Sequence, residues 1–387
     1  MVGRSGETVA EPGQAASGTG PGEHTAGSGA PEPGGGATAG EVLGGYLRAR
    51  AGEFLRALRA HTLSAGTVES AARTAEAVEA LRAAARRLSG TLHTYRPLLD
   101  AEWADHLRAE LSWLSGSLAR EYAYADRLDR LLGSLHRLSG GGGTGRTPPP
   151  PSAPAGRHRE RPAGERAAGG RAGHAGAGED GALPVGAARA GALLDRQLTL
   201  SRTRAHTAAL QALGSARFHA VADAVALLAS EPRLPDGVAD RPAVAGLAPL
   251  AGQARRRLSE AVAALPLSRA GAPYNAEALA RSLAGEARQD AAWHHVRVLL
   301  RLHRYAQEVL GPYAEPDARL LPAGAALERH RDAAEAAAAV AAAAGTPRIA
   351  PATAYALGVL HADQRHEVEA ARFVFGRVWD RGTAGPT

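Results

Sequence analysis

Apolar residues recur at three- and four-residue spacing through most of this chain. Such spacing places the apolar side chains on one face of an α-helix, and segments 74–95 and 293–308 show it clearly. Pro and Gly fall between the periodic segments, as in "SEPRLPDG" and "GTPRIAP", where helices are expected to end. No segment alternates apolar and polar residues as a half-buried β-strand would. The sequence therefore predicts an all-α fold made of antiparallel helical bundles.

Two long segments lack this periodicity and carry few large apolar side chains. Residues 1–38 and 139–183 consist mainly of Gly, Ala, Pro, Ser, Thr and Arg. Segments of this kind bury too little apolar surface to offset the entropy lost on ordering, so we predict that both are disordered. Residues 383–387 form a short tail. The predicted helical domain covers 39–382, with a first half at 39–138 and a second half at 184–382.

The charge of the chain favours an anionic partner. The chain has 387 residues and a formal net charge of +6, and all 45 of its Lys and Arg residues are Arg. The guanidinium group of Arg is permanently charged and matches the geometry of phosphate oxygens. Nucleic acid, polyphosphate and anionic membrane surfaces are therefore the candidate partner classes.

The absence of cysteine limits the chemistry available to the chain. It excludes disulfides, thiolate metal sites and cysteine nucleophiles, and it fits a reducing cytoplasm. No segment has the apolar core of a signal peptide or the length of a membrane span. We therefore expect a soluble cytoplasmic protein with no membrane span.

One predicted helix, "WHHVRVLLRLHRYAQE" at 293–308, is basic on one side and apolar on the other. Because a helix advances about 100° per residue, four basic residues fall within a sector of about 80°. Like charges this close repel one another, so the face is either solvated or neutralised by a polyanion. These four residues are His294, Arg297, Arg301 and Arg304.

The first half contains a related helix. A shift of 215 residues superimposes Arg82 on Arg297 and Arg86 on Arg301, which predicts two pseudo-symmetric bundles whose basic faces meet at a shared channel. A chance match in a chain so rich in Arg and Ala is the alternative. Glu79 stands opposite His294 in this superposition. We expect Glu79 to repel a polyanion or to pair with an arginine, so that the first half binds more weakly.

These residues resemble the motifs of a known family. The pattern H-x-x-R-x-x-x-[KR]-x-x-R-Y, followed by a helix with H-x-D, resembles the CHAD domain, the conserved histidine α-helical domain. The first-half counterpart is present only in part, because Glu79 replaces the histidine and Ser89 replaces the last arginine. The second-half motif is carried here by His294, Arg297, Arg301, Arg304 and Tyr305, then by His330 and Asp332.

This resemblance implies a pair of four-helix bundles around a basic channel, binding of inorganic polyphosphate and association with polyphosphate granules. Such a ligand requires many donors and no catalytic residue, metal or cofactor, so we predict a binding protein and not an enzyme. Other polyanions are further candidate partners, and the sequence does not predict the oligomeric state. The predicted polyphosphate-binding residues are His294, Arg297, Arg301, Arg304, Tyr305, His330, Arg82, Arg86 and Arg87.

Three alternatives remain at this stage. The protein could be a scaffold or adaptor that binds little ligand, with solvated basic faces. It could bind nucleic acid nonspecifically, although aromatic residues make up only 4% of the chain and do not interleave with the basic face. An enzyme is a weaker hypothesis, since the spacing of His361 and His366 places them on different helical faces and makes them a poor metal pair.

Overall fold

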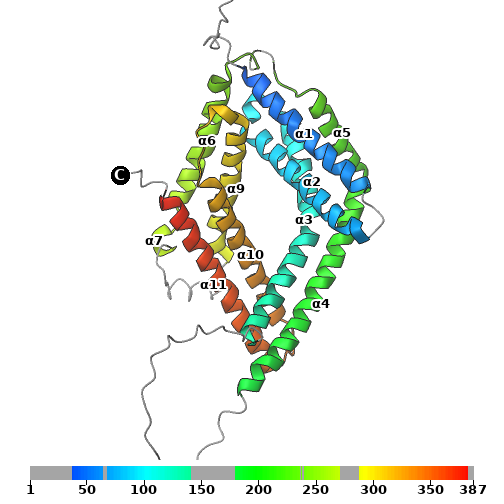
Figure 1. Cartoon of the computed structure of the whole chain (residues 1–387), viewed down its shortest axis with the longest axis vertical. Helices are drawn as coiled ribbons and strands as arrows, with labels where there is room; N and C mark the ends of the chain where they lie inside the picture. The colour runs from blue at the N-terminus through cyan, green and yellow to red at the C-terminus, as the bar shows by residue number, and fades with distance from the viewer. Residues whose placement is uncertain are drawn as a thin grey trace, which may run out of the picture. The chain divides into compact units, whose positions relative to one another are not determined.

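The computed structural model describes residues 37–63, 68–140, 179–235, 237, 239–270 and 287–381. Within these ranges the chain is helical and contains no strand, so the predicted all-α fold is confirmed (Figure 1). The α-helices are α1 (Ala39–Leu63), α2 (Val68–Thr94), α3 (Ala101–Leu138), α4 (Glu179–Leu213), α5 (Ala216–Ser230), α6 (Ala243–Ala263), α7 (Leu267–Ala270), α9 (Ala287–Leu310), α10 (Leu320–Ala344) and α11 (Pro351–Arg381).

Local sequence signals fix where several of these helices begin. The carboxylate of Asp100 accepts a hydrogen bond from the backbone N–H of Trp103 at 3.1 Å and caps the start of α3. The hydroxyl of Ser215 caps α5 in the same way, accepting from the N–H of Phe218 at 3.1 Å. Each cap satisfies a backbone donor that has no partner within the helix.

The core forms from the apolar faces that the periodicity predicts. On α2, for example, buried residues follow one another at spacings of three and four, and they are Val78, Leu81, Ala85, Leu88 and Leu92. They join a cluster with α1, α3, α5, α6 and the last turn of α9. A second cluster joins α4 and the last turns of α3 to α10 and α11. A third joins α6 and α9 to α10 and α11.

These clusters do not follow the boundary between the two predicted halves of the sequence. The end of α3, at Leu131 and Leu135, packs with α10 and α11 of the second half. The end of α9, at Ala306 and Val309, packs with α1 and α2 of the first half. The two halves therefore share their cores, and the described residues from 37 to 381 belong to one compact unit. Pseudo-symmetry between the halves remains a prediction.

The predicted disordered segments lie almost entirely outside the described residues. Helix α3 ends at Leu138, next to the predicted start of the insert at 139. It begins the next at Glu179, five residues before the predicted start of the second half, and Pro184 lies inside that helix.

No single helix in the described ranges is long and apolar enough to cross a membrane. One bent pair, Pro184–Leu213 with Ala216–Ser230, meets the length and composition requirements only when the two helices are taken together.

Candidate anion-binding site

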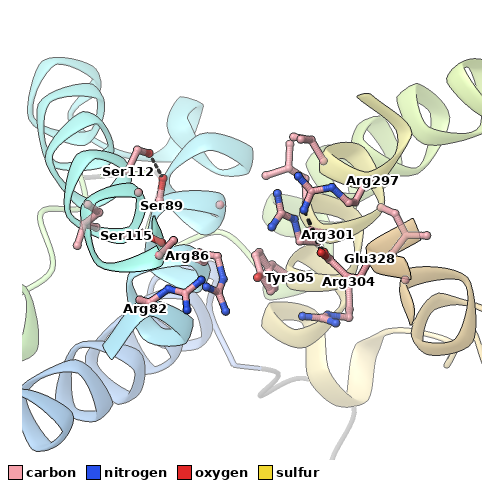
Figure 2. Close-up of a pocket in the computed structure, with 18 of the residues that line it drawn as sticks. Arg82, Arg86, Ser89, Ser112, Ser115, Arg297, Arg301, Arg304, Tyr305 and Glu328 are labelled. Atoms are coloured by element: carbon pink, nitrogen blue, oxygen red, sulfur yellow. Dashed lines mark hydrogen bonds and ion pairs between the residues drawn. The ribbon is translucent and has the colours of Figure 1, made fainter. Parts of the chain in front are cut away.

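A cavity of about 1100 Å³ lies between α2 and α3 on one side and α9 and α10 on the other (Figure 2). Three acidic side chains line it, Glu79, Asp126 and Glu328, against seven arginines, so positive charge is in excess by four. A cleft with one sign of charge concentrates counter-ions of the opposite sign. The seven arginines are Arg82, Arg86, Arg108, Arg297, Arg301, Arg304 and Arg331.

The α9 wall carries the basic face that the sequence predicts. Arg297, Arg301 and Arg304 all line the cavity, whereas Trp293 and Val296 of the same helix are buried in the core. The helical period thus separates a cationic face from an apolar one. Figure 2 shows the three arginines on one wall, across from α2 and α3.

Glu328 of α10 neutralises part of the α9 wall. Its carboxylate accepts hydrogen bonds from Arg297 Nη1 at 3.1 and 3.2 Å and forms an ion pair with Arg331 Nη1 at 3.1 Å. Burial alone would raise the pKa of Glu328, but Arg297 and Arg331 outweigh burial and hold the pKa below its ordinary value. Glu328 therefore stays ionised and occupies the two arginines on either side of it.

Arg301 differs from its neighbours. No carboxylate in the described residues pairs with its guanidinium, although the group lines the cavity. Burial lowers the pKa of Arg301, and the nearby Arg297 cation lowers it further. Even so, an arginine remains charged at neutral pH. The site therefore holds a poorly solvated cation that an incoming anion would stabilise.

The α2 wall is partly neutralised by its own helix. Glu79 accepts from Arg82 Nη1 at 2.6 Å and from Arg86 Nη2 at 3.0 Å. This confirms the expectation that Glu79 pairs with an arginine. Both arginines line the cavity with Glu79 beside them, so their charge is less available than that of Arg301.

Neutral hydroxyl groups complete this wall. Ser89, which replaces an arginine of the family motif, lies 3.1 Å from Ser112 of α3, oxygen to oxygen. Ser115 also lines the cavity. Figure 2 shows the three serines together on the side that faces α9. The two walls are therefore chemically unequal, with charged donors on α9 and a mixture of arginines and hydroxyls on α2 and α3.

Two cavity arginines are absent from the predicted site. Arg108 of α3 donates to His93 Nδ1 at 2.8 Å. The pKa of His93 is lowered mainly by burial and next by the charge of Arg108. Arg331 of α10 belongs to the Glu328 ion pair. Neither belongs to a basic stripe along its own helix, so the sequence offers no signal for them beyond their charge.

Two contacts beside the cavity hold α2 and the residue that follows it against α9. Gly90 of α2 packs against Tyr305, which is 4% exposed and lines the cavity. Tyr95, just beyond α2, donates from its hydroxyl to the backbone oxygen of Ala306 at 3.1 Å. The two basic walls are thus tied together at the level of Tyr305.

Three residues of the predicted site do not line the cavity, and they are Arg87, His294 and His330. Arg87 does not line it, and its Nε donates to Glu308 Oε2 at 3.2 Å. His294 does not line it either, and its ring meets that of His330 edge-on at 5.5 Å. The predicted direct contact of these residues with a ligand has no geometric support.

His330 belongs to a buried polar network and is 1% exposed. Its Nε2 accepts from Arg372 Nε at 3.3 Å and lies 3.4 Å from Asp290 Oδ1. Burial lowers the pKa of His330 to about 4, so the ring is neutral near pH 7. The histidine therefore joins α10 to α9 and α11 and does not reach the cavity.

Comparison with known proteins agrees with the motifs. The sequence model of the CHAD domain matches residues 49–341, which is more than half of the chain. Among solved structures, PptA from Streptomyces chartreusis is 52% identical and superposes with a TM-score of 0.67. The match covers 89% of this chain and 100% of that one. No curated protein matches the chain.

Proposed function

Since the chain belongs to the CHAD domain family, we propose that it binds inorganic polyphosphate in the cavity between α2, α3, α9 and α10, without catalysing a reaction. The observation that carries this proposal is the guanidinium of Arg301, which lies among the other cavity arginines and has no carboxylate partner within the described parts of the chain. An anion there gains charge-assisted hydrogen bonds and relieves a poorly solvated cation.

The chemistry of the walls suits a phosphate chain. Polyphosphate presents repeated anionic oxygens and carries no bases, so it needs donors along a groove and no aromatic stacking surface. Arg297, Arg301 and Arg304 supply guanidinium donors along one wall, and the serines supply neutral donors on the other. Association with polyphosphate granules in the cytoplasm would follow from this binding, and it is part of the proposal.

The test is calorimetric titration of the full chain with polyphosphate at low and moderate salt. We expect binding to weaken steeply with salt, because each neutralised charge releases counter-ions. The variant Arg301→Gln should bind at least about tenfold more weakly, since one charge-assisted hydrogen bond contributes about 1.5–3 kcal/mol. Arg48→Gln is the matched control, because Arg48 is exposed on α1 and outside the cavity.

Two further measurements accompany the titration. A DNA duplex of equal charge distinguishes a phosphate-chain site from a nonspecific nucleic-acid site, and we expect it to bind more weakly. Release of orthophosphate during incubation would contradict the non-catalytic part of the proposal. Equal binding by the wild type and by Arg301→Gln would overturn the assignment of the cavity.

A further inference from the structure

A second cavity, of about 400 Å³, lies on the other side of α9. It is bounded by α6, α9, the segment before α10 and the end of α11, and it shares no lining residue with the larger cavity. α9 separates the two, with Arg301 and Arg304 facing the larger cavity and His303 lining the smaller one. Its volume is at the lower end of the range of small-molecule sites, about 300–1000 Å³.

Two of its cations are available to a ligand. Arg255 and Arg256 are exposed neighbours on α6, and neither forms an ion pair within the described residues. Arg319 is different, because its Nε and Nη2 donate to the carboxylate of Asp317 at 2.9 and 2.8 Å. This pairing neutralises Arg319 and fixes it at the edge of the cavity. Glu260 also lines the cavity, and its negative charge restricts which anions can bind there.

His303 gives the second cavity a buried polar wall. It is 2% exposed, and its Nδ1 has no hydrogen-bond partner in the described part of the chain. A buried polar atom without a partner costs about 1–3 kcal/mol. Such groups are rare in native structures and call for an explanation, which a bound polar ligand supplies.

The aromatic group of the cavity does not favour a nucleobase. Trp379 already lies under the guanidinium of Arg319, 4.8 Å from the ring centroid. It also stacks on Phe375, with centroids 5.6 Å apart. Since these contacts occupy the ring, the remaining donors suit a compact anion that needs no stacking surface.

We propose that this cavity is a second binding site for a short oligophosphate anion, held by Arg255, Arg256 and Ser259 beside His303. The same chemistry could come from a free oligophosphate or from the terminal units of a long chain. The site goes beyond the proposed function, because it uses none of the residues that line the larger cavity.

Tripolyphosphate is the probe, and the tryptophan emission of the full chain is the signal, because Trp379 lines the cavity. We expect saturable emission changes in the wild type and in Arg301→Gln, but none in Trp379→Phe. The double variant Arg255→Gln/Arg256→Gln should bind at least about tenfold more weakly. Its control is Arg257→Gln/Arg48→Gln, which removes two exposed charges outside both cavities.

The outcomes separate this site from the larger one. Loss of the signal in Arg255→Gln/Arg256→Gln, with unchanged circular dichroism and retention in Arg301→Gln, supports the proposal. An unchanged response in that double variant, or no response in the wild type, overturns it. If long-chain polyphosphate changes the tryptophan emission as much as tripolyphosphate does at the same concentration of chain ends, the terminal units of the polyphosphate are the ligand. A response to tripolyphosphate alone identifies the free anion.

Discussion

Gly90 of α2 lies directly against the ring of Tyr305 of α9, so closely that a Cβ atom at Gly90 would stand 2.6 Å from Tyr305 Cδ2. Real Cβ atoms do not approach other atoms to this distance. The absence of a side chain at one position of α2 therefore sets how near the two basic walls can come. The same tyrosine lines the cavity and packs under Arg304, whose guanidinium is 5.2 Å from the ring centroid.

The variant Gly90→Ala should push α2 away from Tyr305. We expect it to lower the free energy of unfolding by about 1–3 kcal/mol, the usual cost of overpacking a core contact. Gly116→Ala is the matched control, because nothing lies within 4 Å of a Cβ at that exposed helical position. It should raise the free energy of unfolding by about 0.5–1 kcal/mol. Urea denaturation of both variants checks the prediction, and equal effects would contradict it.

The variant Arg301→Gln should separate binding from stability. The substitution removes a half-buried cation that no carboxylate of the described residues pairs with, so we expect no loss in the free energy of unfolding despite the loss of polyphosphate binding. Arg297→Gln should weaken binding as well, but it also leaves Glu328 without one of its partners and should destabilise the fold. Thermal melts beside the titrations measure both quantities. A clear destabilisation by Arg301→Gln would mean that the residue has a structural partner.

The variant Glu79→Gln should tighten the binding of polyphosphate. It removes the carboxylate that occupies Arg82 and Arg86, so both become available to phosphate oxygens. An exposed pair of this kind contributes about 0.2–1 kcal/mol, which corresponds to a gain of up to about fivefold in affinity. Glu76→Gln, on the same helix but outside the cavity, should change little. Weaker binding by Glu79→Gln would show that the carboxylate positions the arginines for the ligand.

The variant Asp290→Asn should be among the most destabilising changes in the chain. The carboxylate of Asp290 accepts from Arg365 Nη1 and from Arg372 Nη2, each at 2.7 Å, in a buried network. Removing one member of a buried ion pair typically costs about 3–5 kcal/mol. Asp129→Asn, at an exposed position of α3, is the control. Chemical denaturation measures the difference, and a loss below about 1 kcal/mol would contradict the assigned role.

Stability should depend on pH through His330. Its pKa is about 4 in the folded chain, mainly because of burial, and about 6.5 when unfolded. Between these values the unfolded chain binds more protons, so stability is full above about pH 6.5 and falls as the pH drops towards 4. The slope from this residue is at most about 1.4 kcal/mol per pH unit. Between pH 7 and 5 the free energy of unfolding of His330→Gln should vary less than that of the wild type. The other buried histidines are present in both proteins and contribute equally to each. Parallel curves would exclude His330 as the source.

The sequence alone determined the fold class, because helical periodicity is a local property. The spacing of Val78, Leu81, Ala85 and Leu88 assigns a buried face to α2 without knowledge of what packs there. The same local argument placed Arg297, Arg301 and Arg304 on one side of α9 and Glu79 beside Arg82.

Only the tertiary structure decided which faces meet. Arg108 and Arg331 reach the cavity because α3 and α10 pack beside α2 and α9. The spacing of residues within α3 or α10 does not predict this position. His330 and Arg87 carry the family pattern, yet neither lines the cavity. Their hydrogen-bond partners, Arg372 and Glu308, lie far from them in the sequence. A helical period specifies the direction of a side chain around its own axis. The partner it meets depends on long-range packing and charge pairing, which a single helix does not encode.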